Sequence, residues 1–275
     1  MSARAPATVL AVLGFALASG AASAQSPAGI WLADSKTGCR VWDPAPEPEE
    51  SVRWNGACRN GFADGTGVVE WYKAGSINET IEGTLRAGHL EGRALSHLAN
   101  GTRVEGEYRN DLLEGLVVVT FPNGNKLMQQ HRAGKPLGHF TLLYAGGERA
   151  DGEVDEKGKM WGAETAPNGN RYEGEFRDYK ATGKGTFVDA SNGGTYKGDF
   201  VDGRWEGQGE IIFDNRDIYQ GEFKGGKANG YGVFRKGADG RVFRGTWVDN
   251  CLLPANSENG LGATIGKTLA ECGMR

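Results

Sequence analysis

The sequence predicts an all-β protein, an elongated single-layer antiparallel meander of stacked β-hairpins with disulfide-stapled ends. Three observations predict this fold. A short motif with glycine at its third position returns about every 23 residues, apolar and polar residues alternate within it, and the four cysteines lie in pairs near the two ends of the repeated region. Alternation with a period of two is typical of strands, and a fixed period of this length is typical of repeat arrays.

The repeat units begin at nine positions that lie 22 to 27 residues apart. The second residue after the first is glycine in eight units, and Gln129 is the exception. In the best units two more glycines follow after eleven and thirteen residues, as at Gly183 and Gly185. Because each unit is too small to bury its own core, stacked neighbours must complete it. The first residues are Trp54, Ile81, Val104, Leu127, Ala150, Tyr172, Tyr196, Tyr219 and Phe243.

Each unit is predicted to form one β-hairpin. Tyr172, Gly174 and Phe176 share one face of a strand, and the intervening glutamates face the other way. Asn-Gly pairs such as Asn100-Gly101 separate the units and predict tight primed turns, in which both central residues have positive φ. Glycine weakens a strand, so its repeated use needs a reason. We expect a glycine to leave room for an aromatic ring that leans over from a neighbouring strand.

Three segments, "YEGEF…GKGTF" at 172–187, "YKGDF…GQGEIIF" at 196–213 and "YQGEF…GYGVF" at 219–234, resemble MORN repeats (membrane occupation and recognition nexus). The chain looks like an exported, bacterial-type array of about eight to nine such repeats. The resemblance covers about 54–253, is strong at 54–126 and 172–247, and is poor at 127–170. It implies an elongated, twisted sheet that serves as a scaffold or interaction module. Some members of the family have been linked to membrane lipids and others to self-association.

The ends of the chain differ from the array. Residues 1–24 combine Arg4, an apolar run over 7–18 and Ala22-Ser23-Ala24, which predicts a signal peptide cleaved after Ala24 and export to the periplasm or beyond the cell. The apolar run is too short to span a membrane. We expect an N-terminal cap with a Pro-rich acidic segment at 25–53, the array at 54–253 with weak repeats at 127–171, and a C-terminal cap or tail at 254–275.

The cysteines are interpreted through this predicted export. In an oxidising compartment neighbouring cysteines should pair, which predicts Cys39–Cys58 and Cys251–Cys272 as staples over the terminal repeats. A zinc site built from all four is the alternative. It is disfavoured because no Cys-x-x-Cys spacing occurs and the two pairs lie at opposite ends of the array.

No motif predicts catalysis. The four histidines form no metal-binding spacing, and paired acids such as Glu173 and Glu175 recur as the solvent face of each hairpin. Without Arg4 the mature chain carries 30 basic and 35 acidic residues, a balance that disfavours nucleic acid as a partner. We therefore expect no enzyme activity, no catalytic residue, no metal and no cofactor.

Two functional hypotheses remain. The first is an exported scaffold that binds a protein partner, or a second copy of itself, through the aromatic-glycine face or an open end strand. The alternative is a ligand-binding module that takes a cell-envelope glycan or a membrane lipid in the same aromatic groove. Exposure of the rings separates the two hypotheses. The candidate binding residues are Tyr172, Phe176, Tyr196, Phe200, Trp205, Tyr219, Phe223 and Tyr231.

Overall fold

The structure is a computed structural model that describes residues 29–268 and 270–273. The predicted signal peptide lies outside the described residues, so cleavage after Ala24 stays a prediction. Two single turns of 3-10 helix, η1 (Pro254–Asn256) and η2 (Ala270–Cys272), are the helical elements of the described chain. Within the same residues, no helix has the length and apolar character needed to cross a membrane.

The described chain folds as two compact units. The N-terminal unit contains residues 29–145 and 153–158, and the C-terminal unit contains 146–152 and the described residues from 159 onward. Strand β13 (Arg149–Val154) contributes to both. The division therefore falls within the segment that the sequence marks as weak repeats.

The N-terminal unit holds twelve complete strands. Four of them, β1 (Ile30–Ala33), β2 (Arg40–Asp43), β4 (Cys58–Arg59) and β5 (Phe62–Ala63), form a separate small sheet in the order β1-β2-β5-β4. The other eight are β3 (Glu50–Trp54), β6 (Gly65–Lys73), β7 (Ser76–Arg86), β8 (His89–Leu98), β9 (Arg103–Arg109), β10 (Leu112–Thr120), β11 (Lys126–Arg132) and β12 (Lys135–Leu143).

The C-terminal unit continues the same pattern. A two-stranded sheet of β22 (Cys251–Leu252) and β23 (Ala263–Thr264) follows its last long strand. The long strands are β14 (Met160–Thr165), β15 (Arg171–Arg177), β16 (Lys180–Val188), β17 (Thr195–Val201), β18 (Arg204–Ile212), β19 (Ile218–Lys224), β20 (Lys227–Arg235) and β21 (Val242–Trp247).

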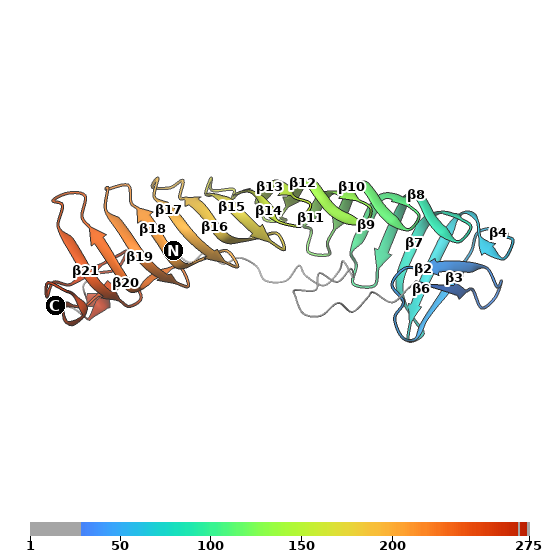
Figure 1. Cartoon of the computed structure of the whole chain (residues 1–275), viewed down its shortest axis with the longest axis horizontal. Coiled ribbons are helices and arrows are strands. Elements are labelled where there is room, and N and C mark those ends of the chain that lie inside the picture. Colours follow the sequence, from blue (N-terminus) through green and yellow to red (C-terminus); the bar gives the residue numbers. More distant parts are fainter. Residues whose placement is uncertain (1–28, 269, 274–275) are drawn as a thin grey trace. The chain divides into compact units, whose positions relative to one another are not determined.

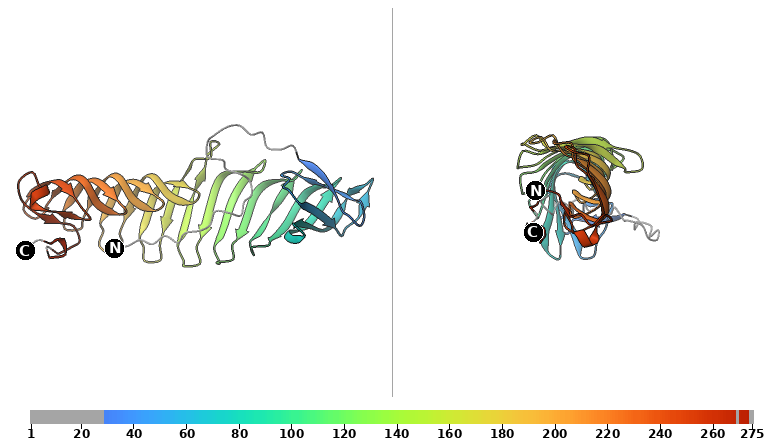
Figure 2. Two further views of the ribbon diagram at one scale, coloured as in Figure 1. Left: turned by 90° about the horizontal axis from the view of Figure 1, so that it is seen from below. Right: turned by 90° about the vertical axis from the view of Figure 1, so that its left-hand side faces the viewer.

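The predicted fold class is confirmed. Strands β3 and β6 to β21 form an open antiparallel meander of 17 strands in chain order. Within each unit, successive strands lie side by side along the sheet, and Figures 1 and 2 show this in two directions. The hairpins therefore stack as the repeat period predicts, each one bonded to the hairpin before and after it.

The primed turns lie at the opposite end of the hairpins from the one predicted. The Asn-Gly pairs that separate the units have positive φ only at the glycine, as at Gly101 (φ 86°), and they form longer loops. The turns in which both central residues have positive φ lie inside the units, as at Ala87-Gly88 (51° and 84°) and Asp202-Gly203 (48° and 78°). The prediction was wrong because Asn-Gly suits either loop, and an asparagine side chain can also close a turn on its own backbone. Asn100 Oδ1 accepts the Thr102 N–H at 2.9 Å in this way.

The two glycines of each Gly-x-Gly pair have different roles. The first has positive φ, and in the C-terminal unit it marks a shift of register, as at Gly207 (φ 63°) between β17 and β18. Such a bulge bends the strand. The second lies in extended backbone beneath a ring. A Cβ at Gly209 would come within 2.5 Å of the Tyr196 hydroxyl oxygen, which confirms that glycine leaves room for the ring.

Across the C-terminal unit, the second glycines lie in register with glycines of the neighbouring strands. Direct register partners carry glycine on every strand from β14 to β21, and we call this set the glycine row. The rings of Tyr172, Tyr196 and Tyr219 lie over it, each on the glycines of its own hairpin. Its members are Gly162, Gly174, Gly185, Gly198, Gly209, Gly221, Gly232 and Gly245.

Ring contacts join each hairpin to the next. The Tyr172 ring meets Phe200 of the following unit edge-on, with centroids 4.7 Å apart, and Tyr196 meets Phe223 in the same way at 4.9 Å. Tyr219 meets Trp247 at 5.2 Å. Edge-to-face pairs add about 0.5–1.5 kcal/mol each beyond the area they bury. A ring therefore covers its own glycines and also packs against an aromatic ring of the neighbouring repeat.

The weakest repeat keeps its place in the sheet although it lacks the motif. In β11, Leu127, Gln129 and His131 occupy the positions of tyrosine, glycine and phenylalanine, and all three are buried. Gln129 Nε2 donates to the backbone oxygen of Gln130 at 2.9 Å. Burial lowers the pKa of His131, which favours the neutral ring. The strand pairs with β10 and β12, so buried polar groups with hydrogen bonds replace the ring here.

Both predicted disulfides are present. Cys39–Cys58 joins the small N-terminal sheet, and Cys39 packs with Val52, Trp54 and Leu85 in one buried cluster. The Trp31 ring of β1 contacts Trp42, Phe62 and His89 with centroids 4.9–5.1 Å away. This small sheet therefore covers the first hairpins of the meander, as the terminal repeats of an array require.

The C-terminal cap covers the last long strand. Glu258 N–H donates to Arg244 O at 2.8 Å, and Asn259 Nδ2 donates to Val242 O at 3.2 Å, so two outward carbonyl groups of β21 are satisfied. The Cys251–Cys272 disulfide fastens the same segment. The expectation of an open end strand is therefore wrong for β21, because the cap takes the place of a further strand.

Adding a methyl group to the glycine row should destabilise the stack. We expect Gly209→Ala to lower the free energy of unfolding by about 1–3 kcal/mol, because the new Cβ collides with the Tyr196 ring at a position with no room. Chemical denaturation followed by circular dichroism measures this. The control is Lys197→Ala on the exposed face of β17, which should change stability by less than about 0.5 kcal/mol. Equal stability of the two variants would contradict the role of the row.

The two disulfides should stabilise different ends. Replacing Cys251 and Cys272 by serine should cost about 3 kcal/mol and speed amide exchange in β21 to β23. The matched Cys39→Ser, Cys58→Ser variant should instead speed exchange in β1 to β5. Hydrogen–deuterium exchange with peptide resolution reads both effects. Faster exchange spread evenly over both units in either variant would show that the staples do not act as local caps.

Candidate functional site

Six of the eight candidate binding rings are buried in the sheet. Tyr196 and Tyr219 are 0% exposed, and the other four are at most 5% exposed. Their hydroxyl groups are also satisfied, since Tyr172 Oη donates to Glu175 O at 2.7 Å and Tyr196 Oη to Asp199 O at 3.0 Å. Burial raises the pKa of each tyrosine well above its usual value. The rings therefore form the core, and a ligand cannot reach them. The six are Tyr172, Phe176, Tyr196, Phe200, Tyr219 and Phe223.

The other two candidates lie elsewhere. Trp205 is half-buried and stacks on Tyr196, with centroids 4.4 Å apart and planes inclined by 8°. Tyr231 is 49% exposed on the opposite face of β20, and its hydroxyl donates to Glu258 Oε1 at 2.6 Å. The structure therefore does not bring the eight residues together into one open aromatic groove.

The open surface is the opposite face of the same strands, which we call the outer face. Residues that alternate with the rings lie on it, and their direct register partners form a polar row across β15 to β19. The row presents a carboxylate, a hydroxyl, an ammonium, a second carboxylate and an amide in turn. Its members are Glu173, Thr186, Lys197, Glu210 and Gln220.

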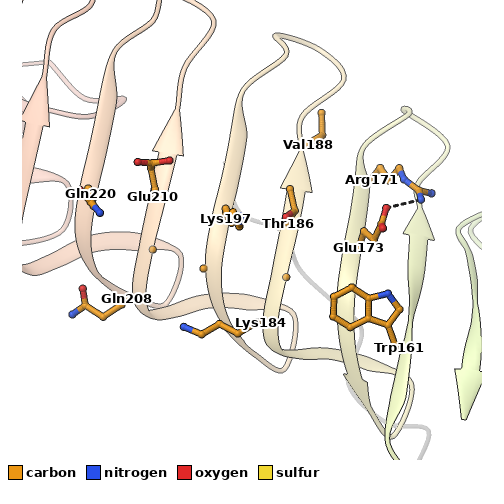
Figure 3. A pocket seen from close by; sticks show the side chains of 13 residues that line it. Trp161, Arg171, Glu173, Lys184, Thr186, Val188, Lys197, Gln208, Glu210 and Gln220 are labelled. Carbon is orange, nitrogen blue, oxygen red and sulfur yellow. Dashed lines mark hydrogen bonds and ion pairs between the residues drawn. The ribbon is translucent and has the colours of Figure 1, made fainter. Parts of the chain in front are cut away.

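A groove of about 740 Å³ follows this polar row. Figure 3 shows Trp161 at one end and Gln220 at the other, with Lys184 and Gln208 along one side. Gly185, Gly198 and Gly209 also line it, so the backbone of the glycine row forms part of the floor. The groove exists because the rings occupy one side of these glycines and no side chain covers the other.

Ion pairs hold part of the groove wall. Arg171 and Glu173, two residues apart on β15, pair at 2.9 Å, and Lys184 of β16 pairs with Asp199 of β17 at 2.6 Å. Asp199 also accepts the Gln208 N–H at 3.0 Å, next to the bulge at Gly207. Asp199 therefore satisfies a backbone N–H group at the bulge. The sequence alone, which placed Asp199 on the solvent face, did not predict this role. These groups are exposed, so each pair contributes little to stability.

The N-terminal unit has a smaller hollow of about 380 Å³. Arg86, Arg93 and Arg109 line it from three neighbouring strands, together with Glu91. Arg93 is paired with Glu105, and Glu91 accepts the Asn110 N–H at 2.9 Å. Arg86 and Arg109, which precede turns, thus line one hollow with Arg93 of the strand between them, and nearby acids offset part of their charge.

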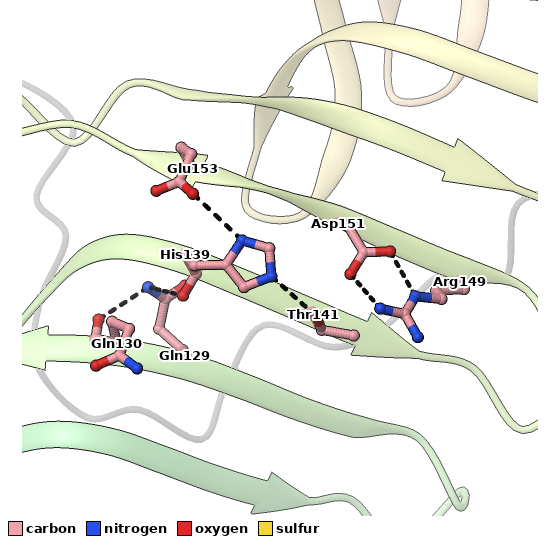
Figure 4. Close-up of polar contacts among 7 residues, drawn as sticks. All are labelled: Gln129, Gln130, His139, Thr141, Arg149, Asp151 and Glu153. Atoms are coloured by element: carbon pink, nitrogen blue, oxygen red, sulfur yellow. Dashed lines mark hydrogen bonds and ion pairs between the residues drawn. The ribbon is translucent and has the colours of Figure 1, made fainter.

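One histidine has partners in the order known from hydrolase triads. His139 Nδ1 lies 3.2 Å from Glu153 Oε1, and His139 Nε2 lies 3.3 Å from Thr141 Oγ1 (Figure 4). A nucleophile must reach its substrate, but Thr141 is only 5% exposed. The histidine and glutamate are mostly exposed, so water screens their interaction. The sequence gives no sign of this cluster because its members come from β12 and β13, in the weak repeats.

The described residues contain no cluster of side chains that could bind a metal ion. No group of three or more histidine, cysteine, aspartate or glutamate side chains there could hold an ion. All four cysteines are in disulfides, which removes the thiolates that the zinc alternative needed.

Comparison with known families agrees with the geometry. The MORN repeat matches at 105–126, 172–194, 196–218 and 219–238. A search of curated proteins gave no significant match. MORN repeats are generally non-catalytic modules, and they indicate a role in interaction or scaffolding. The chain is therefore a MORN-repeat protein, with matched repeats at four places between residues 105 and 238.

Proposed function

We propose that this protein is an exported, non-catalytic scaffold that holds a partner protein on the outer face of its C-terminal unit. The proposal rests on the difference between the two faces of the sheet. The rings fill one face, and the other is left with exposed side chains in register. A stacked sheet of this kind needs only one face for stability, so the second is available for contact.

The proposed docking surface lies beside the loops. Register partners on β16 to β21 form a second row on the outer face, which we call the loop-side row. Val188 is 37% exposed and Ile212 is 42% exposed, and Arg235 offers a charged anchor among them. An apolar strip bordered by polar groups is typical of protein interfaces. The row consists of Val188, Thr195, Ile212, Ile218, Arg235 and Val242.

Two features favour a different protein over a second copy or a lipid. The C-terminal cap occupies the outer edge of β21, so this end of the sheet is not open to strand pairing with a second copy. Acidic side chains lie beside basic ones on the outer face, as in the pairs Arg171–Glu173 and Lys184–Asp199, so this face does not present the uniformly positive surface that binds anionic lipids. Both disulfides support an oxidising location and hence export.

A photo-crosslinking amino acid at position 212 should capture the partner in cells of the native host. We expect one discrete product from position 212 and none from position 224, at the exposed end of β19 away from the row. Adding Ile218→Glu beside the crosslinker should remove the product, because it places a charge in the apolar strip.

Three results would contradict the proposal. They are the lack of a product at position 212, a product that Ile218→Glu leaves unchanged, and a product of twice the chain's mass, which would assign the row to a second copy. Mass spectrometry of the product distinguishes them.

A further inference from the structure

The groove on the outer face contains one feature that protein docking on the loop-side row leaves unexplained. Trp161 of β14 is 49% exposed. Its chain neighbours Met160 and Gly162 are buried, so the indole projects away from the ring core. Among the described residues it has no ring, hydrogen-bond or ion-pair partner, unlike the rings of the core. A large, unpartnered aromatic surface at the end of a groove offers a flat platform for stacking.

The groove beside it offers both donors and acceptors. Gln208 and Gln220 each carry an amide with two donor hydrogens and one acceptor oxygen, and Glu210 supplies a carboxylate. Lys197 is exposed and has no ion pair in the described part of the chain. Hydroxyl groups donate and accept at once, so a lining with both kinds of group matches a ligand rich in hydroxyls.

The charge of the lining disfavours a strongly charged ligand. Three basic and two acidic residues line the groove, and two of the basic ones are already paired, Arg171 with Glu173 and Lys184 with Asp199. A polyanion would meet both free and paired carboxylates along the row. A neutral or weakly charged ligand meets no such repulsion.

The direction of the groove sets the shape of the ligand. The groove crosses β15 to β19 above the glycine row, and neighbouring strands lie roughly 4.8 Å apart. One sugar ring of a linear glycan has a similar length, so successive rings would meet successive strands. A peptide would bind through backbone groups at a sheet edge or through apolar pockets. The floor offers no free sheet edge, because the strands there are paired on both sides. Most of the side chains that line it are polar or charged, which does not suit an apolar pocket.

We propose that this groove binds a linear oligosaccharide. One sugar face stacks on Trp161, and the hydroxyl groups of the following rings hydrogen-bond to Lys197, Gln208, Glu210 and Gln220. This activity goes beyond the proposed protein contact and uses other residues, except for Val188 at the border of both surfaces. The scaffold would thereby hold its protein partner beside a glycan.

The test measures binding of defined oligosaccharides to the purified protein. Tetramers of N-acetylglucosamine, of glucose and of mannose are titrated by isothermal calorimetry. We expect saturable binding of at least one tetramer, and at least tenfold weaker binding by Trp161→Ala, because the stacking platform is lost. Gln208→Ala should weaken the same binding severalfold, since it removes two donors and an acceptor. The control is Tyr231→Ala, which removes an equally exposed ring outside the groove and should keep the affinity within twofold.

Two results would overturn the inference. One is the lack of binding to all three tetramers by the folded wild-type protein. The other is unchanged affinity of Trp161→Ala, whose fold is checked by its thermal unfolding. Neither result would contradict the proposed docking of a partner protein. That proposal is tested separately by the crosslink from position 212, which should still form in Trp161→Ala.

Discussion

The glycine row is the constraint on which the rest of the structure depends. Eight aligned glycines remove the side chains from one line across β14 to β21, and the tyrosine rings lie flat in the space that results. Without that line, a sheet one layer thick could not bury large rings. The rings then contact rings of the neighbouring hairpins edge to face. The glycine row therefore makes room for the rings and, through them, determines how the repeats stack. The outer-face groove follows from it as well, since its floor is the other side of the row.

The sequence predicted those parts of the fold that depend on local pattern. Periodic glycines and alternating apolar residues predicted the hairpins, the meander and the space for the rings, because these features repeat at fixed spacing. The disulfides followed from two cysteines near each end. The position of the primed turns was missed because Asn-Gly fits two kinds of loop, and the pairs that form them differ in sequence, from Ala87-Gly88 to Asp249-Asn250. The cap on β21 was missed because it depends on backbone contacts of a tail without a repeated motif.

The candidate site was harder to predict than the fold. Whether Tyr196 is a binding platform or core depends on what lies against it, and Trp205, Phe223 and the next hairpin cover it completely. The groove could not be found from the motif, because the side chains that line it are at the variable positions between the motif residues. Trp161 occurs in a weak unit where no repeat signal draws attention to it. His139, Thr141 and Glu153 meet only through pairing of neighbouring strands in the same weak region.

The separation of the two faces has a consequence for how such a protein changes over evolutionary time. Substitutions among the rings or the glycine row act on every neighbouring repeat, so selection for folding restricts them. Positions such as Thr186, Lys197, Glu210 and Gln220 contribute little to packing and can vary one repeat at a time. A new combination of side chains along the row is therefore accessible through single steps that leave the scaffold intact. Duplication of one hairpin would lengthen the surface by two strands and would also copy the glycines that make room for its ring. Both the size and the specificity of the surface can therefore evolve without a new core.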